Sequence, residues 1–183
     1  MTRHKHIIVF TDLDGTLLDH ATYRYDDAVQ ALDSLKEKGI PVVLCSSKTA
    51  VEIVGLKNLM DNPHPFIAEN GSVVAIPANY YPQGTPDYPV TGQIDRHDIY
   101  CIGGDRKRLL GKLHRIRNDN EFKFSGFSDM SANRLSQITG LDIKAARLAR
   151  QRMSTEPLLW EDSDNNWHQF TRELKKNGLA WVQ

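Results

Sequence analysis

Residues 7–18 decide the fold, and they read Ile7-Ile8-Val9-Phe10-Thr11-Asp12-Leu13-Asp14-Gly15-Thr16-Leu17-Leu18. The first four form an unbroken β-branched and aromatic run, which is typical of a strand covered on both faces. Two acidic residues, Asp12 and Asp14, follow directly, and Gly15 permits a sharp turn after them. The stretch therefore predicts two carboxylates at the tip of a buried strand.

The next fifty residues continue as alternating helices and strands. Ala28, Val29, Leu32 and Leu35 recur at helical spacing, and Gly39 follows as a helix stop signal. The predicted elements are helix Asp26–Lys38, strand Ile40–Leu44, helix Ala50–Met60 and strand Pro65–Ala68. Strands joined by helical crossovers predict a parallel sheet and hence an α/β fold.

A second lobe is predicted after a segment rich in proline and glycine. We expect a first lobe at residues 1–76, a linker at 77–95 and a second lobe at 96–183. The predicted strands of the second lobe are Ile99–Ile102, Phe122–Phe127, Leu158–Trp160 and Leu179–Val182. Its predicted helices are Arg106–Arg117, a hairpin over Ala132–Arg152 broken at Gly140, and Trp167–Lys176. Antiparallel pairing is plausible in this lobe because its strands are less uniformly apolar.

The composition indicates an ordinary globular protein. The chain has 23 basic and 23 acidic side chains and 40% hydrophobic residues, so no basic excess favours nucleic acid or an anionic membrane as a partner. No apolar run approaches the length of a signal peptide core or a transmembrane helix. The only two cysteines, Cys45 and Cys101, lie far apart, which favours reduced thiols and a cytoplasmic location.

Polar motifs follow three predicted parallel strands, where ligands bind in such sheets. They are Asp12/Asp14, Ser46/Ser47 and Glu69/Asn70. Two carboxylates so close together are hard to ionise without a cation between them, and Mg²⁺ with its preference for oxygen ligands is suited to that place. Ser46 has a second interpretation as the N-cap of the following helix, a role for which Thr49 competes.

These motifs resemble a known family. Asp12-Leu13-Asp14-Gly15-Thr16 after its apolar strand is similar to the first motif of the haloacid dehalogenase (HAD) superfamily. Cys45-Ser46-Ser47-Lys48-Thr49 and Glu69-Asn70-Gly71 resemble its mannosyl-3-phosphoglycerate phosphatase branch. The resemblance implies a Rossmann-like core with an inserted α/β cap domain at 96–183. It also implies a Mg²⁺-dependent phosphatase that acts on a small phosphorylated sugar or glycerate, mannosyl-3-phosphoglycerate above all.

Residue roles follow from the resemblance. Asp12 would be the nucleophile and a metal ligand, and Asp14 the general acid and base, with its backbone carbonyl as a second metal ligand. The backbone around Leu13 and Gly15 would hold phosphate oxygens. Further phosphate or substrate contacts would come from Ser46, Ser47, Lys48 and Asn70. In the cap, Arg152, Ser154 and Glu156 are either contacts to a carboxylate and a sugar or part of a solvated loop.

The family pattern is incomplete in one respect. These phosphatases carry a lysine and a Gly-Asp-x-x-x-Asp motif after the cap. Lys175 and Lys176 lie instead on a predicted cap helix, and Asp162 and Asp164 precede that helix. We therefore expect a C-terminally truncated core that has little or no activity by itself. The alternatives are a phosphatase or phosphomutase for another sugar phosphate, and a non-catalytic module that binds a phosphometabolite.

Overall fold

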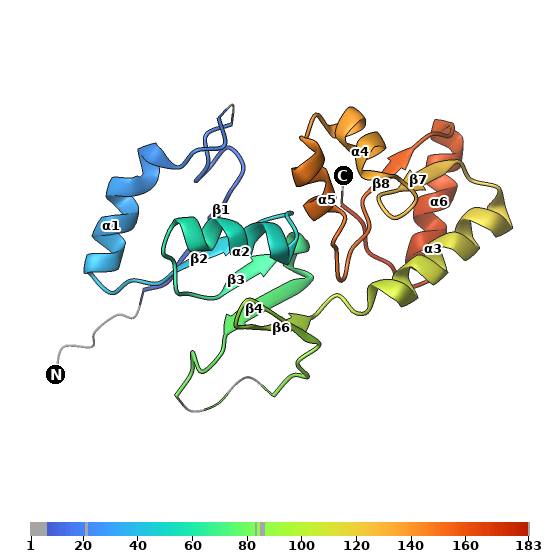
Figure 1. Cartoon of the computed structure of the whole chain (residues 1–183). Coiled ribbons are helices and arrows are strands. Elements are labelled where there is room, and N and C mark those ends of the chain that lie inside the picture. Colours follow the sequence, from blue (N-terminus) through green and yellow to red (C-terminus); the bar gives the residue numbers. More distant parts are fainter. Residues whose placement is uncertain (1–6, 21, 83, 85–86, 183) are drawn as a thin grey trace. The chain divides into compact units, whose positions relative to one another are not determined.

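A computed structural model of the chain describes residues 7–20, 22–82, 84 and 87–182 (Figure 1). The chain divides into two compact units, Met1–Ile102 and Gly103–Gln183, called here the first and second unit. Each unit has its own sheet and its own hydrophobic core, so each is described separately.

The first unit is built on a mixed six-stranded sheet in the order β1-β2-β3-β4-β6-β5. Its strands are β1 (Val9–Asp12), β2 (Val42–Cys45), β3 (Phe66–Ala68), β4 (Val73–Pro77), β5 (Gly92–Ile94) and β6 (His97–Cys101). Strands β1, β2 and β3 are parallel, as the sequence predicted. The remaining strands pair antiparallel, so the α/β prediction is confirmed for a sheet that is only partly parallel.

The boundary between the units lies after Ile102, whereas the sequence placed it within 77–95. The physical reason is that β4 continues the buried apolar pattern of the sheet and pairs with β3 and β6. The predicted second-lobe strand Ile99–Ile102 corresponds to β6 and therefore belongs to the first unit. The segment rich in proline and glycine connects β4 to β5 within one sheet. Proline and glycine content alone does not distinguish such a connection from a linker between domains.

The two helices of the first unit bury very different amounts of surface. Helix α2 (Ala50–Leu59) buries Ala50, Ile53 and Val54, and it follows the carboxyl end of β2. The 3₁₀ turn η1 (Asp26–Ala28) and helix α1 (Val29–Glu37) contain no fully buried residue. Among the described residues β1 pairs only with β2, which makes it an edge strand, and Phe10 on it is 61% exposed.

The second unit combines a two-stranded antiparallel sheet with four helices. The elements are α3 (Arg106–Asn120), β7 (Phe124–Gly126), α4 (Ala132–Thr139), α5 (Ile143–Ala149), β8 (Leu158–Trp160) and α6 (Asp164–Lys176). One core joins side chains of α3, α6 and both strands, among them Leu113, Phe124 and Phe170. A smaller core lies between α4 and α5 around Leu135 and Ala146. The antiparallel pairing expected for this lobe is therefore present.

One predicted strand of the second unit is wrong. Residues 179–182 are not paired in a sheet in the described part of the chain. Helix α6 ends where Gly178 takes a left-handed φ of 68° and the Leu179 N–H donates to the Leu174 carbonyl. Leu179 then packs on the α3/α6 core and Trp181 lies against Trp167. The apolar residues at 179–182 therefore reflect packing of side chains after α6, and not the pairing of a strand.

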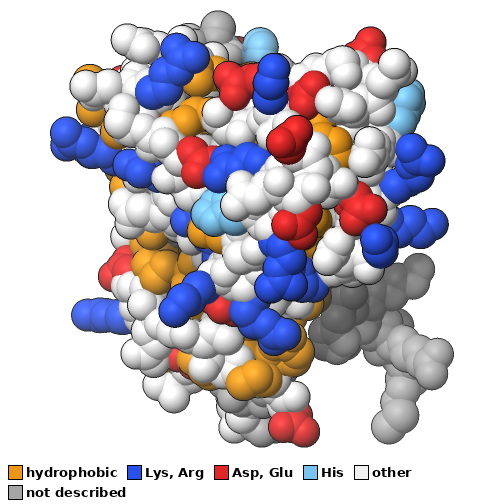
Figure 2. All heavy atoms as spheres, turned by 90° about the vertical axis from the view of Figure 1, so that its right-hand side faces the viewer, with side chains coloured by type: hydrophobic (Ala, Val, Ile, Leu, Met, Phe, Trp, Pro, Cys, Tyr) orange, Lys and Arg blue, Asp and Glu red, His pale blue; other side chains and the backbone are white. Residues whose placement is uncertain are grey.

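One face of the molecule (Figure 2) carries side chains of both charges, in line with the balanced composition. On the face drawn in Figure 2, lysine and arginine side chains are interspersed with aspartate and glutamate. No helix within the described ranges is both long enough and apolar enough to cross a bilayer.

A buried lysine supports the turn that follows α2. The Lys57 side chain is almost completely enclosed, at 2% exposure. Its ammonium donates to the His64 carbonyl and to Asn62 Oδ1 at 3.4 Å, and lies 5.6 Å from the centre of the Phe66 ring. Burial lowers the pKa of Lys57 from 10.5 to about 8.

This burial predicts a pH dependence of stability. Above pH 8 the folded state releases the Lys57 proton while the unfolded chain still holds it, so the free energy of unfolding rises with pH up to about 10.5. Between pH 7 and 9.5 we expect a gain on the order of 2 kcal/mol relative to Lys57→Met, measured by urea unfolding. Lys38→Met, at an exposed position, should keep the gain. Equal pH profiles for the wild type and Lys57→Met would contradict this prediction.

Candidate active site

A pocket of about 200 Å³ opens at the carboxyl ends of β1, β2 and β3. Its lining residues come from the three predicted polar motifs and their neighbours. They are Asp12, Cys45, Ser46, Ser47, Ile67, Asn70 and Gly71. The structure therefore brings residues of all three predicted motifs into one open pocket of the first unit, namely Asp12, Ser46, Ser47 and Asn70. The predicted site residues Asp14, Gly15 and Lys48 are not among those that line it.

Sheet register and loop hydrogen bonds place these residues. Asp12 lies opposite Cys45 at the end of the β1–β2 ladder. The Ser46 N–H donates to the Ile67 carbonyl at 3.0 Å, and the Ser46 carbonyl accepts from the Asn70 N–H at 3.1 Å. These backbone hydrogen bonds connect the loop after β2 to the loop after β3, and they hold in place the residues that line the pocket.

The loop after β3 has an unusual backbone. It forms the 3₁₀ turn η2 (Glu69–Gly71), in which all three residues have a positive φ, at 51°, 56° and 91°. Glycine and asparagine tolerate this region, but a buried glutamate does not adopt it readily. Such strain is often found at functional sites, where the surrounding structure holds it in place. The turn directs Asn70 and Gly71 to the pocket.

Asp14 lies beside a lysine from the neighbouring loop. Lys48 Nζ is 2.9 Å from Asp14 Oδ1, with side-chain exposures of 21% and 37%. The same ammonium lies 5.4 Å from the centre of the Tyr23 ring. Lys48 was predicted as a phosphate or substrate contact, and Tyr23 was missed. A tyrosine in a surface loop has no sequence signal that would have pointed to the site.

Thr49, not Ser46, caps helix α2. The Thr49 hydroxyl accepts the Glu52 N–H, while Glu52 Oε2 accepts the Thr49 N–H at 2.8 Å, which completes a capping box. Ser46 is buried and its hydroxyl accepts the Lys48 N–H at 3.2 Å. The interpretation of Ser46 as the N-cap of α2 is therefore wrong, and Ser46 lines the pocket.

Gly15 serves the turn after β1. It has a φ of 70°, which favours glycine, and its N–H donates to the Leu18 carbonyl at 3.0 Å. The Leu18 N–H in turn donates to the Leu13 carbonyl at 2.8 Å. The predicted contact between the Gly15 amide and phosphate would therefore compete with this internal hydrogen bond.

Cys45 is a further nucleophilic side chain in the pocket, and its environment opposes ionisation. Burial, and then the negative charge of Asp12, raise the pKa of the Cys45 thiol above its usual value. Since the thiolate is the reactive form of cysteine, Cys45 is a poor nucleophile here. The exposed Asp12 carboxylate is the better candidate.

The pocket offers oxygen ligands for a metal ion, though few of them. The described residues contain no group of three or more His, Cys, Asp or Glu side chains placed to hold a metal. Mg²⁺ needs fewer protein ligands, because it keeps several waters and commonly binds through one or two carboxylates. The Asp12 carboxylate in the pocket fits this sparse kind of site, and Asp14, two residues further along the chain, would add its backbone carbonyl.

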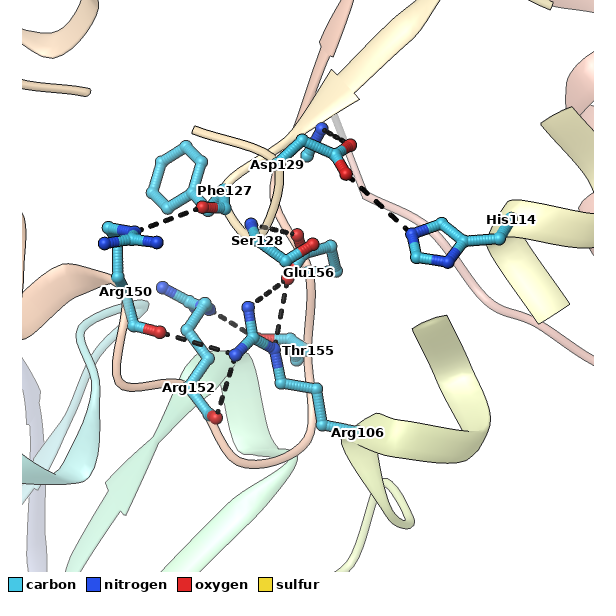
Figure 3. A network of polar contacts seen from close by, with 10 residues as sticks. Arg106, His114, Phe127, Ser128, Asp129, Arg150, Arg152, Thr155 and Glu156 are labelled. Atoms are coloured by element: carbon cyan, nitrogen blue, oxygen red, sulfur yellow. Dashed lines mark hydrogen bonds and ion pairs between the residues drawn. The ribbon is translucent and has the colours of Figure 1, made fainter. Parts of the chain in front are cut away.

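The three residues proposed from the sequence as substrate contacts in the cap, Arg152, Ser154 and Glu156, form contacts within the second unit (Figure 3). The Glu156 carboxylate is 1% exposed and forms an ion pair with Arg106 at 2.5 Å. Glu156 also accepts the Ser128 N–H at 2.6 Å. Ser154 donates its hydroxyl hydrogen to the Gly104 carbonyl. Glu156 and Ser154 therefore hold the fold of this unit.

Two further contacts belong to the same network. Arg152 Nε donates to Thr155 Oγ1 at 2.8 Å within the loop. Gly126 passes so close to Glu156 that a Cβ there would lie 2.4 Å from Oε1. The close approach explains why glycine stands at the end of β7.

Comparisons with known proteins agree with this geometry. Residues 9–84 match the model of the haloacid dehalogenase-like hydrolase family. The partly parallel sheet and the carboxylate at the end of β1 agree with this match, so the chain is similar to the haloacid dehalogenase-like hydrolases over residues 9–84.

Two curated relatives carry the same name, glucosyl-3-phosphoglycerate/mannosyl-3-phosphoglycerate phosphatase. The one from Methanococcoides burtonii is 43% identical over 98% of this chain and 64% of its own length. The one from Persephonella marina is 36% identical over 85% of this chain and 56% of its own length. The chain thus spans less than two thirds of either relative.

A solved structure supports the fold. A protein from Thermoplasma acidophilum aligns over 98% of this chain and 61% of its own chain, with a TM-score of 0.58 and 15% sequence identity. At that identity the similarity shows a shared architecture and nothing about substrate.

The Arg106–Glu156 pair gives a test of the structural role of Glu156. Arg106→Met should lower the free energy of unfolding by about 3–5 kcal/mol, because it leaves a buried carboxylate without its cation. Arg117→Met is the matched control in the same unit, since the Arg117–Asp129 pair is more exposed on both sides and should contribute under about 1 kcal/mol. Urea unfolding measures both. Equal losses for the two variants would contradict the structural role.

Proposed function

We propose that the chain carries the nucleophilic half of a Mg²⁺-dependent phosphatase site that hydrolyses phosphate monoesters through an aspartyl-phosphate on Asp12. The observation that carries this proposal is the exposed Asp12 carboxylate in a pocket whose wall is formed by Ser46 and Asn70. Asp14 follows two residues later, beyond the strand end. Mannosyl-3-phosphoglycerate and its glucosyl analogue are the proposed substrates, from the names of the two curated relatives.

The reaction divides into two displacements. In the first, an Asp12 oxygen attacks phosphorus and the bond between phosphorus and the ester oxygen breaks, while Asp14 gives its proton to the leaving alcohol. In the second, Asp14 takes a proton from water, the water oxygen attacks phosphorus, and the acyl phosphate bond to Asp12 breaks. Inorganic phosphate leaves, and both carboxyl groups return to their starting protonation states.

The pocket residues have supporting roles in this scheme. The Ser46 hydroxyl and the Asn70 side chain line the wall from which they can donate to phosphoryl oxygens. Ser47, on the same loop, is a further phosphate or substrate contact expected there, whereas the Lys48 ammonium is directed to Asp14. The Asp12 carboxylate and the Asp14 carbonyl would hold Mg²⁺, whose positive charge would offset the negative charge of the phosphate.

Substitution of the two aspartates tests the proposal in a form of the chain extended with the segment of a curated relative that the chain does not cover. Asp12→Asn should abolish phosphate release from mannosyl-3-phosphoglycerate, because an amide does not attack phosphorus. Asp14→Asn should slow turnover by about 10²–10⁴-fold, the usual contribution of a general acid or base. Asp27→Asn, at an exposed position in η1, controls for loss of a surface charge. Substantial turnover by Asp12→Asn would sink the assignment, and tight binding of the substrate without turnover would favour a binding module.

A phosphate mimic tests the site independently of turnover. Crystals soaked with Mg²⁺ and fluoroberyllate or vanadate should carry the mimic on Asp12, next to Ser46. The physical reason is that these species occupy the place of a phosphoryl group bonded to a carboxylate. A mimic bound instead at Lys107 or Arg108 of α3 would count against the pocket.

A further inference from the structure

The Asp14 carboxylate lies on an exposed turn, where its side chain could take several orientations. To act as a general acid, it must point toward the leaving-group oxygen of the substrate. Asp14 lies directly beyond β1, and its side chain is 37% exposed. The turn itself is closed by backbone hydrogen bonds from Gly15 and Leu18. Those bonds fix the backbone of Asp14, but they leave the direction of its carboxylate to a side-chain contact.

That contact comes from Lys48. Its Nζ lies 2.9 Å from Asp14 Oδ1, within hydrogen-bonding distance. The backbone of Lys48 is also held on both sides of its Cα atom. Its N–H donates to Ser46 Oγ at 3.2 Å, and its carbonyl accepts the Glu69 N–H at 2.9 Å. A lysine with a fixed backbone and only 21% side-chain exposure has few positions for its ammonium.

Tyr23 limits those positions further. Its ring centre is 5.4 Å from the same Nζ, a distance at which a ring face attracts a cation. Tyr23 has a positive φ of 55°, and its N–H donates to the Asp19 carbonyl at 2.9 Å. Asp19 Oδ1 in addition accepts the Thr22 N–H and hydroxyl, each at 2.7 Å. The loop is therefore folded on itself in a way that presents the Tyr23 ring to Lys48.

We propose that Lys48, held against the face of Tyr23, is a positioning residue that aims the Asp14 carboxylate at the leaving-group oxygen. The inference deepens the proposed function and its kinetic part rests on it. It assigns Lys48 a different action from direct contact with phosphate, because the ammonium is already directed to Asp14. It also adds Tyr23, from a loop outside the strand-end motifs, to the residues that support catalysis.

A double-mutant cycle on phosphate release, in the same extended form of the chain, distinguishes the two actions of Lys48. Lys48→Met should lower kcat about 10- to 100-fold, the effect of a misdirected catalytic group, with KM nearly unchanged. Lys48→Arg should restore much of the loss, since it keeps a cation at this place. In an Asp14→Asn background, Lys48→Met should have no further effect. Effects that add, or a rise in KM at unchanged kcat, would show that Lys48 binds the phosphate and would overturn the proposal.

Lys36→Met is the matched control for this cycle. Lys36 also forms a lysine–aspartate ion pair, at 2.6 Å with Asp61. Lys36 lies in the last turn of α1 and Asp61 follows the C-terminus of α2, so the pair is on the side of the sheet edge away from the pocket. The loss of that pair should leave kcat and KM as in the wild type. A loss as large as that of Lys48→Met would mean that any broken ion pair in this unit slows turnover, and would overturn the positioning role.

Tyr23 is tested through its ring. Tyr23→Leu should lower kcat about two- to fivefold, the effect of losing an exposed contact between a cation and a ring. Tyr23→Phe keeps the ring face and should recover most of this loss. Equal losses in both variants would assign the effect to the hydroxyl and remove Tyr23 from the proposal.

Crystal structures provide a readout that does not depend on turnover. The wild type and Lys48→Met are compared with Asp14 as the reporter. We expect the Asp14 carboxylate to turn away or to lose a single orientation once Lys48 is gone. A carboxylate that keeps its orientation in Lys48→Met would overturn the positioning role. If Asp12→Asn were fully active, the proposed function would fail, while this comparison would still decide whether Lys48 orients Asp14.

Discussion

Backbone hydrogen bonds between the ends of β2 and β3 are the constraint on which the candidate site depends. Ser46 donates to Ile67 and accepts from Asn70, and the Lys48 carbonyl accepts from Glu69. The pocket residues Ser46, Ile67 and Asn70 are thus attached to a backbone with little freedom. Preorganisation of this kind favours reactions in which charge develops at a fixed point, because little rearrangement is needed when the reaction occurs.

The second unit is organised around a different constraint, a buried ion pair. Glu156 and Arg106 join the loop before β8 to the start of α3. A buried charge that loses its partner is strongly destabilising, so neither residue is free to change by itself. This explains how an acidic residue in a loop can look like a substrate contact in the sequence and yet be structural. The sequence shows the residue type, whereas burial and partner decide its role.

The sequence predicted the parts of the fold that depend on local patterns. Apolar runs located β1, β2 and β3, and helical spacing with the stop signal at Gly39 located α1. The order of these elements implied that Asp12, Ser46 and Asn70 would meet. It missed what depends on long-range pairing: the antiparallel extension through β6, and the packing of Leu179 on the α3/α6 core in place of a strand. Tyr23 was missed for the same reason, since its contact with Lys48 joins residues 25 positions apart.

The Lys48–Asp14 pair also bears on the charge that the proposed chemistry needs. A phosphate monoester approaching Asp12 brings negative charge toward a carboxylate, and the repulsion must be offset nearby. The Lys48 ammonium lies 2.9 Å from Asp14 Oδ1, so it is directed to that residue and not to Asp12 or the phosphate. The charge of Asp12 and of the phosphate then requires a separate cation, which is the part proposed for Mg²⁺. On this argument lysine and metal are not interchangeable in the site: the lysine sets the direction of the acid, and the metal offsets the charge of the nucleophile and the phosphoryl group.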